Sequence, residues 1–296
     1  MTITFGGVGT TTERAAMALL RGSVLWIGAA VLLAGCVSRP DSRYPPNPAN
    51  AASRGSYSTD TKDRPTASDE TDASRRASVR LELAGAYFSR GQMTTALDEV
   101  KKSISANPNV AAAFNLRGLI YGNLGDHQLA EESFRRAMQL DPKDADVMQN
   151  FGWYLCQRDR YAEADVLFSR ALAVPQYQES ARTLLTQGVC QARGGKPDEA
   201  EHTLVRAYVL EPGNPAIAVN LSEVLYRKGD VERARFYIRR VNAVPSFVSA
   251  QTLWLAARIE NKIGNAQGSA DFSEQLRNRF PQSPEATALA EGRFNE

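Results

Sequence analysis

The chain has 296 residues, of which 43% are hydrophobic, and a formal net charge of +2 at pH 7. Its length suffices for one large domain or two small ones, and a charge so close to zero argues against a nucleic-acid partner. Two histidines and three cysteines are too few for a zinc site of the usual Cys/His kind, and no pair of them has the spacing of metal ligands. We therefore expect neither nucleic acid nor a metal or other cofactor to bind.

Residues 1–35 have the pattern of an export signal. Arg14 and Arg21 precede an apolar run over residues 23–35. The run has about 13 residues, whereas a membrane-spanning helix needs roughly 20. A short apolar run behind positive charge is typical of a secretory signal peptide. Translation from Met17 rather than from the first residue would give a more compact signal, so both starts stay open.

The tetrapeptide Leu33-Ala34-Gly35-Cys36 closes the apolar run. It resembles the lipobox of bacterial lipoproteins, in which the signal peptide is cut before the cysteine and acyl chains are attached to it. The resemblance implies lipidation of Cys36, and several acyl chains, at about 0.8 kcal/mol per buried methylene, anchor a protein durably. Val37 follows the cysteine in place of Asp, which in bacterial lipoproteins favours the outer membrane, so we expect an anchor on its periplasmic face. The alternative is an ordinary signal peptide or a short membrane helix in which Cys36 is incidental.

Residues 36–76 comprise the lipidated cysteine and a linker to the rest of the chain. The segment is rich in Ser, Thr, Pro, Asp and Arg, and its few large apolar residues show no periodicity. Burial of so few apolar side chains cannot offset the entropy of folding. We expect a disordered N-terminal region, in which a flexible linker of 40 residues would span about 35 Å root-mean-square.

From residue 77 onward the sequence repeats at a nearly constant period. A small residue, alanine in five cases of six, recurs at spacings of 34, 34, 36, 34 and 35 residues: Ala96, Ala130, Ala164, Ala200, Ala234 and Ser269. This period is the signature of tetratricopeptide (TPR) repeats, each of which is a pair of helices. The spacing predicts an all-α fold over residues 77–296, a right-handed superhelix (α-solenoid) of six TPR helix pairs. We place the repeats at 77–110, 111–144, 145–180, 181–214, 215–249 and 250–283, followed by a short C-terminal cap.

Other positions fall into the same register, and each has a packing reason. Small residues in the first helix let two helices cross closely: Ala84, Gly118, Gly152, Gly188, Ser222 and Ala257. Large residues in the second helix fill the space beside the crossing: Val100, Phe134, Phe168, Leu204 and Ile238. A turn residue, Gly in five repeats and Asp159 in the third, ends the first helix, and a proline ends the second. The sixth repeat has weaker matches, among them Glu260 and Ser273, and is still expected to be a helical pair.

The first helices of successive repeats line a concave groove in TPR proteins. In the first three repeats of this chain the corresponding positions combine apolar side chains with amides. We expect the partner-binding groove to comprise Leu81, Phe88, Asn115, Leu119, Asn123, Gln149, Trp153 and Gln157. Such a mixture suits an extended or helical segment of a partner protein; the alternative is that Phe88 and Trp153 are packing residues. In the last three repeats the same positions are more basic and include Arg182, Arg193, Arg227, Arg258 and Lys262.

Cys156 and Cys190 fall on the first helices of two successive repeats. A disulfide requires Cα atoms within about 7 Å of each other, whereas adjacent helices usually lie about 8–10 Å apart. Although the periplasm would permit oxidation, we favour two buried thiols.

Catalytic motifs do not stand out in the sequence. It has no glycine-rich phosphate-binding loop, and no Ser or Cys is placed with the His and Asp partners that activate a nucleophile. We therefore expect no enzymatic activity and no small-molecule substrate.

Three stretches within the repeats are distinctive: Asn150–Ala164, Val174–Ser180 and Leu221–Tyr226. Together with the lipobox and the six repeats, they resemble the PilF and PilW lipoproteins of type IV pilus biogenesis. The resemblance implies a pilotin, which binds pilus secretin subunits and promotes their localisation to the outer membrane and their multimerisation. The chain departs from regular TPR spacing in the third and fifth repeats, where the final proline comes one residue early. The alternative is a scaffold for another outer-membrane assembly or for a polysaccharide-export machine.

Overall fold

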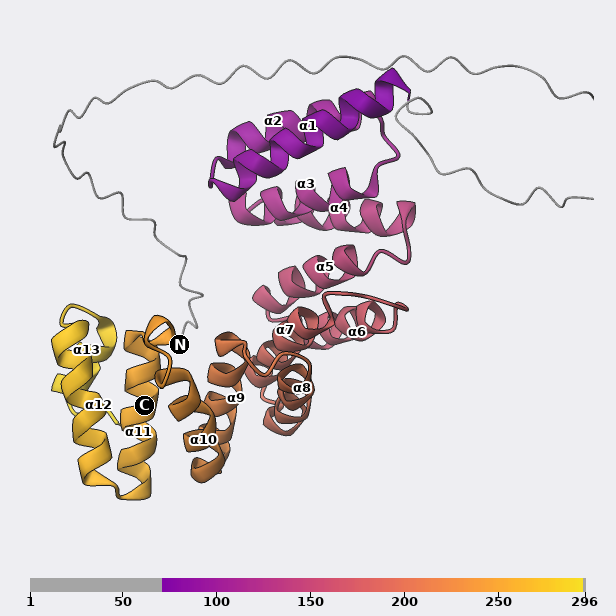
Figure 1. Cartoon of the computed structure of the whole chain (residues 1–296). Helices are drawn as coiled ribbons and strands as arrows, with labels where there is room; N and C mark the ends of the chain where they lie inside the picture. The colour runs from indigo at the N-terminus through magenta and orange to yellow at the C-terminus, as the bar shows by residue number, and fades with distance from the viewer. Residues whose placement is uncertain (1–70, 295–296) are drawn as a thin grey trace, which may run out of the picture. The chain divides into compact units, whose positions relative to one another are not determined.

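The computed structural model describes residues 71–294, and every regular element in that range is helical (Figure 1). Six successive helix pairs account for most of it, as the repeat spacing predicts. The pairs are α1 (Asp72–Ser89) with α2 (Met93–Ala106), α3 (Ala111–Leu124) with α4 (His127–Leu140), α5 (Ala145–Gln157) with α6 (Tyr161–Leu172), α7 (Ser180–Arg193) with α8 (Pro197–Leu210), α9 (Pro215–Lys228) with α10 (Val231–Asn242), and α11 (Ala250–Ile263) with α12 (Ala266–Arg279). A short 3-10 turn, η1 (Pro245–Phe247), and a last helix, α13 (Pro284–Ala290), complete the described chain.

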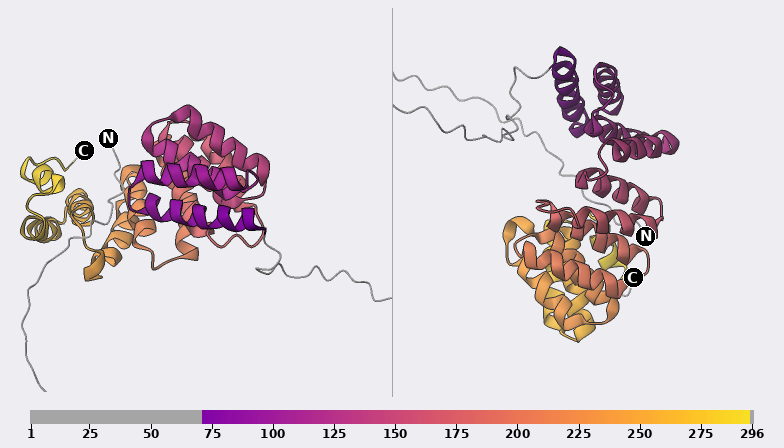
Figure 2. Two further views of the ribbon diagram at one scale, coloured as in Figure 1. Left: turned by 90° about the horizontal axis from the view of Figure 1, so that it is seen from above. Right: turned by 90° about the vertical axis from the view of Figure 1, so that its right-hand side faces the viewer.

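The pairs stack in chain order. Each α-helix contacts the next one along the chain, and the first helices of neighbouring pairs also contact each other, from α1 with α3 through to α9 with α11. Both views in Figure 2 show this succession of pairs. A stack in which each repeat touches only its neighbours is an α-solenoid, so the predicted fold class is confirmed.

The crossing of the two helices within a pair depends on glycine in three of the repeats. A Cβ atom added to Gly118 would lie 2.9 Å from the ring of Phe134, and one added to Gly188 would lie 2.6 Å from Leu204 Cγ. Both distances are shorter than any van der Waals contact, so only glycine fits unless the neighbour moves. Phe134 and Leu204 are fully buried. The small-against-large pairing expected from the repeat pattern is therefore present.

The turn between the two helices of each pair also follows the repeat pattern. Its central residue has a positive φ in all six pairs: Gly91, Gly125, Asp159, Gly195, Gly229 and Gly264. Glycine adopts this left-handed conformation without steric cost, and a short polar residue such as Asp tolerates it better than other non-glycine residues. The Asp159 carboxylate also accepts a hydrogen bond of 2.5 Å from the Tyr161 hydroxyl.

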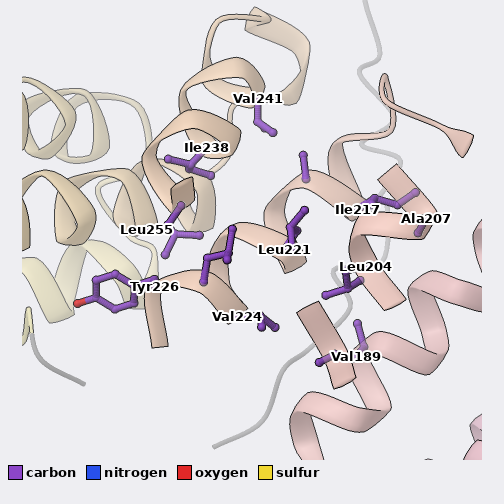
Figure 3. Packing of buried hydrophobic residues seen from close by; sticks show 14 of the residues in the cluster. Val189, Leu204, Ala207, Ile217, Leu221, Val224, Tyr226, Ile238, Val241 and Leu255 are labelled. Carbon is purple, nitrogen blue, oxygen red and sulfur yellow. The ribbon is translucent and has the colours of Figure 1, made fainter. Parts of the chain in front are cut away.

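Buried hydrophobic side chains continue from one pair to the next. The largest cluster draws on five successive helices, α7 to α11, with Val189, Leu204, Leu221, Ile238 and Leu255 as examples (Figure 3). Each pair therefore buries its apolar surface partly against its neighbours. This continuous core explains why a repeat with weaker consensus residues can still fold within the stack.

Helix α1 begins at Asp72, five residues before the first repeat placed from the sequence. Thr71 caps it, because its hydroxyl oxygen accepts a hydrogen bond from the Ser74 amide at 3.1 Å. The predicted signal peptide, Cys36 and almost all of the predicted linker lie outside the described residues. Among helices between residues 71 and 294, none combines the length and the apolarity needed to cross a membrane.

The sixth pair forms despite its departures from the repeat pattern. Glu260, at a position normally occupied by a large residue, is only 1% exposed. Its carboxylate accepts hydrogen bonds from Arg235 at 2.9 Å and Arg239 at 2.7 Å, both on α10, and from Asn265 at 2.7 Å. Burial alone would raise the pKa of Glu260, but these hydrogen bonds outweigh burial and lower that pKa below its ordinary value. An ionic contact thus joins α10 to α11 at a position that carries a tyrosine or leucine in four of the other five repeats.

The expectation of two free thiols at Cys156 and Cys190 is wrong, because the two residues form a disulfide between α5 and α7. Their Cα atoms lie 5.8 Å apart, within the range that a disulfide requires. The spacing of 8–10 Å used in the prediction is the distance between helix axes. Residues that face each other where two helices cross approach more closely than the axes do. Both cysteines are buried, as expected.

Candidate protein-binding surfaces

The first helices α1, α3 and α5 carry the residues predicted to bind a partner. We call their shared face the N-terminal surface. Its four predicted apolar residues are half-buried: Leu81, Phe88, Leu119 and Trp153. Leu81 and Phe88 pack against the core of the first two pairs, and Leu119 and Trp153 pack against a core formed mainly by the second and third pairs. Each residue therefore contributes to packing and still leaves part of its side chain accessible.

The predicted amides of the N-terminal surface differ in how accessible they are. Asn123 and Gln157 are exposed, and Asn115 is half-buried. The Asn123 side chain donates to the Leu119 carbonyl oxygen at 2.8 Å, and Asn150 donates to the Asn115 side-chain oxygen at 3.4 Å. Gln149 is only 4% exposed. Asn123 and Gln157 are thus the amides that a partner would meet first.

Two exposed apolar residues on α1 were not predicted from the sequence. Val79 is 57% exposed and Leu83 is 36% exposed, and their spacing of four residues places them on one face of the helix. Within the described chain no helix pair precedes α1. The face that carries these residues therefore lacks the cover that a preceding pair gives to later first helices. The sequence feature that could have revealed this face is the spacing of Val79 and Leu83, two apolar residues four positions apart outside the consensus positions of the repeat.

An ion-pair cluster joins α1 to α2 beside these residues. Arg80 donates to one oxygen of the Glu99 carboxylate at 2.7 Å, and Lys102 donates to the other oxygen at 2.7 Å. These hydrogen bonds, the one from Lys102 first, lower the pKa of Glu99 below its ordinary value. The carboxylate is therefore ionised at neutral pH and holds the two helices together next to the apolar face.

The first helices of the fifth and sixth pairs have a different character, and we call their shared face the C-terminal surface. The Arg258 guanidinium lies 4.7 Å from the centre of the Tyr226 ring and 6.0 Å from that of Trp254. The Lys262 ammonium lies 5.0 Å from the Tyr226 ring centre. These are cation–π distances. Arg258 and Lys262 were expected here from the sequence, whereas the two rings beneath them were not singled out. Tyr226 and Trp254 occupy the repeat positions of Phe88 and Leu81, respectively.

The other basic residues predicted for the last three pairs are dispersed. Arg227 donates to Glu223 on its own helix at 2.7 Å, and Arg182 is exposed on α7. Arg193 is half-buried at the end of α7. The basic character of this half is therefore concentrated at Arg258 and Lys262, where aromatic rings accompany it.

Two hollows lie against the second helices. One, of about 670 Å³, is polar and is lined by residues of α6, α7 and α8, among them Asp165, Gln187 and Gln191. Both glutamines donate to the Asp165 carboxylate, at 2.9 and 2.8 Å. The other, of about 390 Å³, is more apolar and includes Tyr208, Val244 and Phe247. Across residues 71–294, no three His, Cys, Asp or Glu side chains come together in an arrangement that could hold a metal ion.

Comparison with known families supports the repeat assignment. Models described as "Tetratricopeptide repeat" match residues 111–144, 145–174 and 192–244. The first of these ranges coincides with the second repeat placed from the sequence.

Relatives and solved structures add a closer relationship. The type IV pilus assembly protein PilF of Pseudomonas aeruginosa is 26% identical over 217 residues, which cover 72% of this chain and 84% of that protein. A crystal structure of PilW, described as a widely conserved type IV pilus biogenesis factor, matches with a TM-score of 0.68 at 29% identity and covers 72% of this chain and 98% of PilW. A solved structure of P. aeruginosa PilF matches with a TM-score of 0.66 at 22% identity, covering 75% of this chain and all of the other, and supports the fold alone.

The stacked helix pairs and their accessible first helices define a TPR protein, a class whose extended surfaces bind other proteins. Within that class the chain is a homologue of the type IV pilus proteins PilF and PilW. The resemblance to PilF and PilW found in the repeats is thereby confirmed.

Proposed function

We propose that this chain is an outer-membrane lipoprotein of type IV pilus biogenesis that binds secretin subunits and promotes their localisation and multimerisation. The observation that carries the proposal is the similarity to PilF and PilW, which extends over 84% and 98% of those chains. A similarity confined to one or two repeats would indicate only the TPR fold. Here it extends along the stack of helix pairs, so a shared role is the simplest interpretation.

The N-terminal surface is the part of the described chain that fits a secretin segment best. Phe88 and Trp153 provide apolar contacts that stay partly accessible, and Asn123 and Gln157 provide amides that can hydrogen-bond a peptide backbone. Val79 and Leu83 lie on the opposite side of α1 and add a separate exposed apolar contact. An amphipathic partner helix or an extended segment would meet both kinds of group. In this mechanism the protein holds its partner without chemical change, so it has no enzymatic activity and no small-molecule substrate.

The lipid on Cys36 supplies the second half of the mechanism. It would tether the TPR domain to the outer membrane through the linker, so that a bound secretin subunit is kept at the membrane where the ring assembles. Replacing Cys36 by Ser removes the acylated thiol, and we expect the protein to become soluble or to remain at the inner membrane. Recovery of the Cys36→Ser protein in the outer membrane would contradict the anchor.

A deletion strain tests the whole proposal. Without this chain, heat-stable secretin multimers in the outer-membrane fraction should fall to a small part of the normal level, because unassisted subunits do not reach the membrane. Expression of the wild-type chain should restore them. Normal multimers in the deletion strain would contradict the pilotin role, and a loss of exopolysaccharide export instead would favour the alternative scaffold.

A further inference from the structure

The described chain does not end at its last helix but turns back toward the C-terminal surface. After α13, Gly292 adopts a positive φ of 68°, a conformation that ends a helix and redirects the chain. The Gly292 amide donates to the Leu289 carbonyl oxygen at 3.1 Å, and the Arg293 amide donates to that of Ala288 at 2.9 Å. These bonds fix the direction in which Phe294 leaves the helix.

Phe294 makes contacts with the two preceding first helices. Its ring centre lies 5.1 Å from that of Trp254, at an interplanar angle of 47°. Its carbonyl oxygen accepts hydrogen bonds from the Tyr226 hydroxyl at 3.2 Å and from Arg258 Nε at 3.2 Å. Tyr226 belongs to α9, whereas Trp254 and Arg258 belong to α11. The segment therefore spans the first helices of two different repeats.

The contacts of Phe294 extend beyond the cap of the last repeat. Helix α13 covers the sixth pair through Ala286 and Leu289, which pack with Leu253 and Leu276, and Phe294 packs against the same cluster. Phe294 also crosses to Tyr226, 68 residues earlier in the sequence. In doing so it presents an aromatic side chain and a backbone carbonyl to a row of first-helix residues, as a bound peptide would.

The groups around Phe294 define the ligand that they recognise. Trp254 offers an aromatic face, and Tyr226 and Arg258 offer two donors that converge on one carbonyl oxygen. Lys262 lies over the same Tyr226 ring and adds a second positive charge at the site. Aromatic contact, a carbonyl oxygen that accepts two hydrogen bonds, and two cations together suit a peptide that carries an aromatic residue beside a carboxylate.

We propose that Tyr226, Trp254, Arg258 and Lys262 form a second peptide-binding site, which takes an aromatic residue from an acidic segment of a partner protein. In the free chain Gly292–Phe294 occupies this site and is displaced when the partner binds. Because the occupant is covalently attached, it competes at an effective concentration in the millimolar range, so only a partner that binds more tightly than a free peptide gains access. This site is distinct from the N-terminal surface. The proposal does not depend on which protein binds to the N-terminal surface.

A peptide supplied in trans tests the site directly. The full chain is shortened by a stop codon after Glu291, which leaves α13 intact, and is titrated against a fluorescent peptide with the sequence of residues 290–296. We expect saturable binding by fluorescence anisotropy, and binding at least about tenfold weaker to the chain that retains its own segment. A peptide with Ala in place of Phe294 should bind the shortened chain at least about tenfold more weakly, because the contact with Trp254 is lost.

Matched tyrosine variants locate the binding. Tyr226→Phe in the shortened chain removes only the hydroxyl donor and should weaken peptide binding several-fold. Tyr237→Phe makes the same change on α10, outside the site, and should leave binding unchanged. If the shortened chain fails to fold, Phe294→Ala in the full chain is titrated instead and should bind the peptide more tightly than wild type does.

Three results would overturn the proposal. The first is no binding of the peptide by either the shortened or the Phe294→Ala chain. The second is equal binding by the wild-type and shortened chains, which would show that the segment does not compete. The third is a concentration-dependent dimer of the full chain that Phe294→Ala abolishes, because a second copy would then be the natural occupant.

Discussion

The two ends of the solenoid use the same scaffold for different chemistry. On the N-terminal surface, Leu81, Phe88 and Trp153 form an apolar and partly accessible face. On the C-terminal surface the equivalent helices carry cations above aromatic rings, and Phe294 covers them. In the first five pairs the buried positions are alike, a small residue facing a larger one. The comparison teaches that the buried residues of each repeat determine how the helix pairs stack. The outward-facing residues of the first helices can then differ and determine what each half binds.

The largest expected effect concerns the scaffold that both halves share. Phe134→Ala or Phe168→Ala should lower the free energy of unfolding by about 3–5 kcal/mol, because each removes a fully buried ring and leaves a cavity. Phe236→Ala is the control, since Phe236 is 53% exposed, and should cost about 1 kcal/mol or less. Urea denaturation measures all three. Equal losses for Phe134 and Phe236 would contradict the packing described.

The disulfide lies where the two halves meet, between the third and fourth pairs. Replacing Cys156 and Cys190 together by Ala should lower the free energy of unfolding by about 3–4 kcal/mol, as expected for a loop closed over 34 residues. Urea denaturation with and without a reductant checks this. The reductant should lower the free energy of unfolding of the wild-type chain and leave that of the double variant unchanged. An unchanged free energy of unfolding of the wild-type chain on reduction would contradict the disulfide.

The Glu260 contact distinguishes the C-terminal half, where an ionic group replaces apolar packing. Because the folded-state pKa of Glu260 is lowered, the carboxylate contributes stability above its unfolded pKa of about 4.3, and this contribution is lost as the pH falls through the folded pKa. Glu260→Gln should cost about 1–3 kcal/mol at pH 7, where it removes the charge that Arg235 and Arg239 contact.

The same denaturation series at pH 3 provides the control for this prediction. The difference between wild type and Glu260→Gln should shrink there, since the unfolded chain binds a proton at Glu260 below its unfolded pKa of about 4.3, before the folded chain does. A difference that is independent of pH would show that ionisation of Glu260 is not what joins α10 to α11.

The smallest effect on stability is expected at the exposed positions of the N-terminal half. Val79→Glu should change the free energy of unfolding by less than about 0.5 kcal/mol, because Val79 is 57% exposed, yet it should reduce secretin multimers in cells. Val166→Glu is a matched control on α6, because Val166 is 58% exposed, and should leave the multimers unchanged. Equal effects of the two variants would show that the exposed apolar face of α1 has no special role.

Most of the fold could be predicted from the sequence because repetition makes each match support the others. The helix pairs, their turns and the glycine contacts of Gly118 and Gly188 all follow from one register. The disulfide could not be predicted, because the prediction used the distance between helix axes instead of the approach of facing residues. The burial of Glu260 also needed the structure, since its arginine partners lie on a different helix pair.

The candidate surfaces were harder to predict than the fold. Consensus positions indicate which residues face the first-helix surface, and on that basis Leu81, Phe88 and Trp153 were selected. They do not indicate how deeply each side chain is packed, so Gln149 was included although it is buried. Consensus positions also do not indicate whether a neighbouring helix pair covers a residue. Val79 is exposed on α1, which no helix pair precedes within the described chain. Contacts from outside the repeats, such as that of Phe294 with Trp254, follow only from the path of the chain.

Site-specific photocrosslinking in cells tests the central claim most directly. A crosslinking amino acid is placed at Phe88 or Trp153 on the N-terminal surface and, as the matched control, at Val166 on the opposite helix of the third pair. The account predicts that the first two positions capture the pilus secretin subunit and that the control does not. Capture of the secretin only from Val166, or from none of the three in cells that assemble secretin normally, would contradict it.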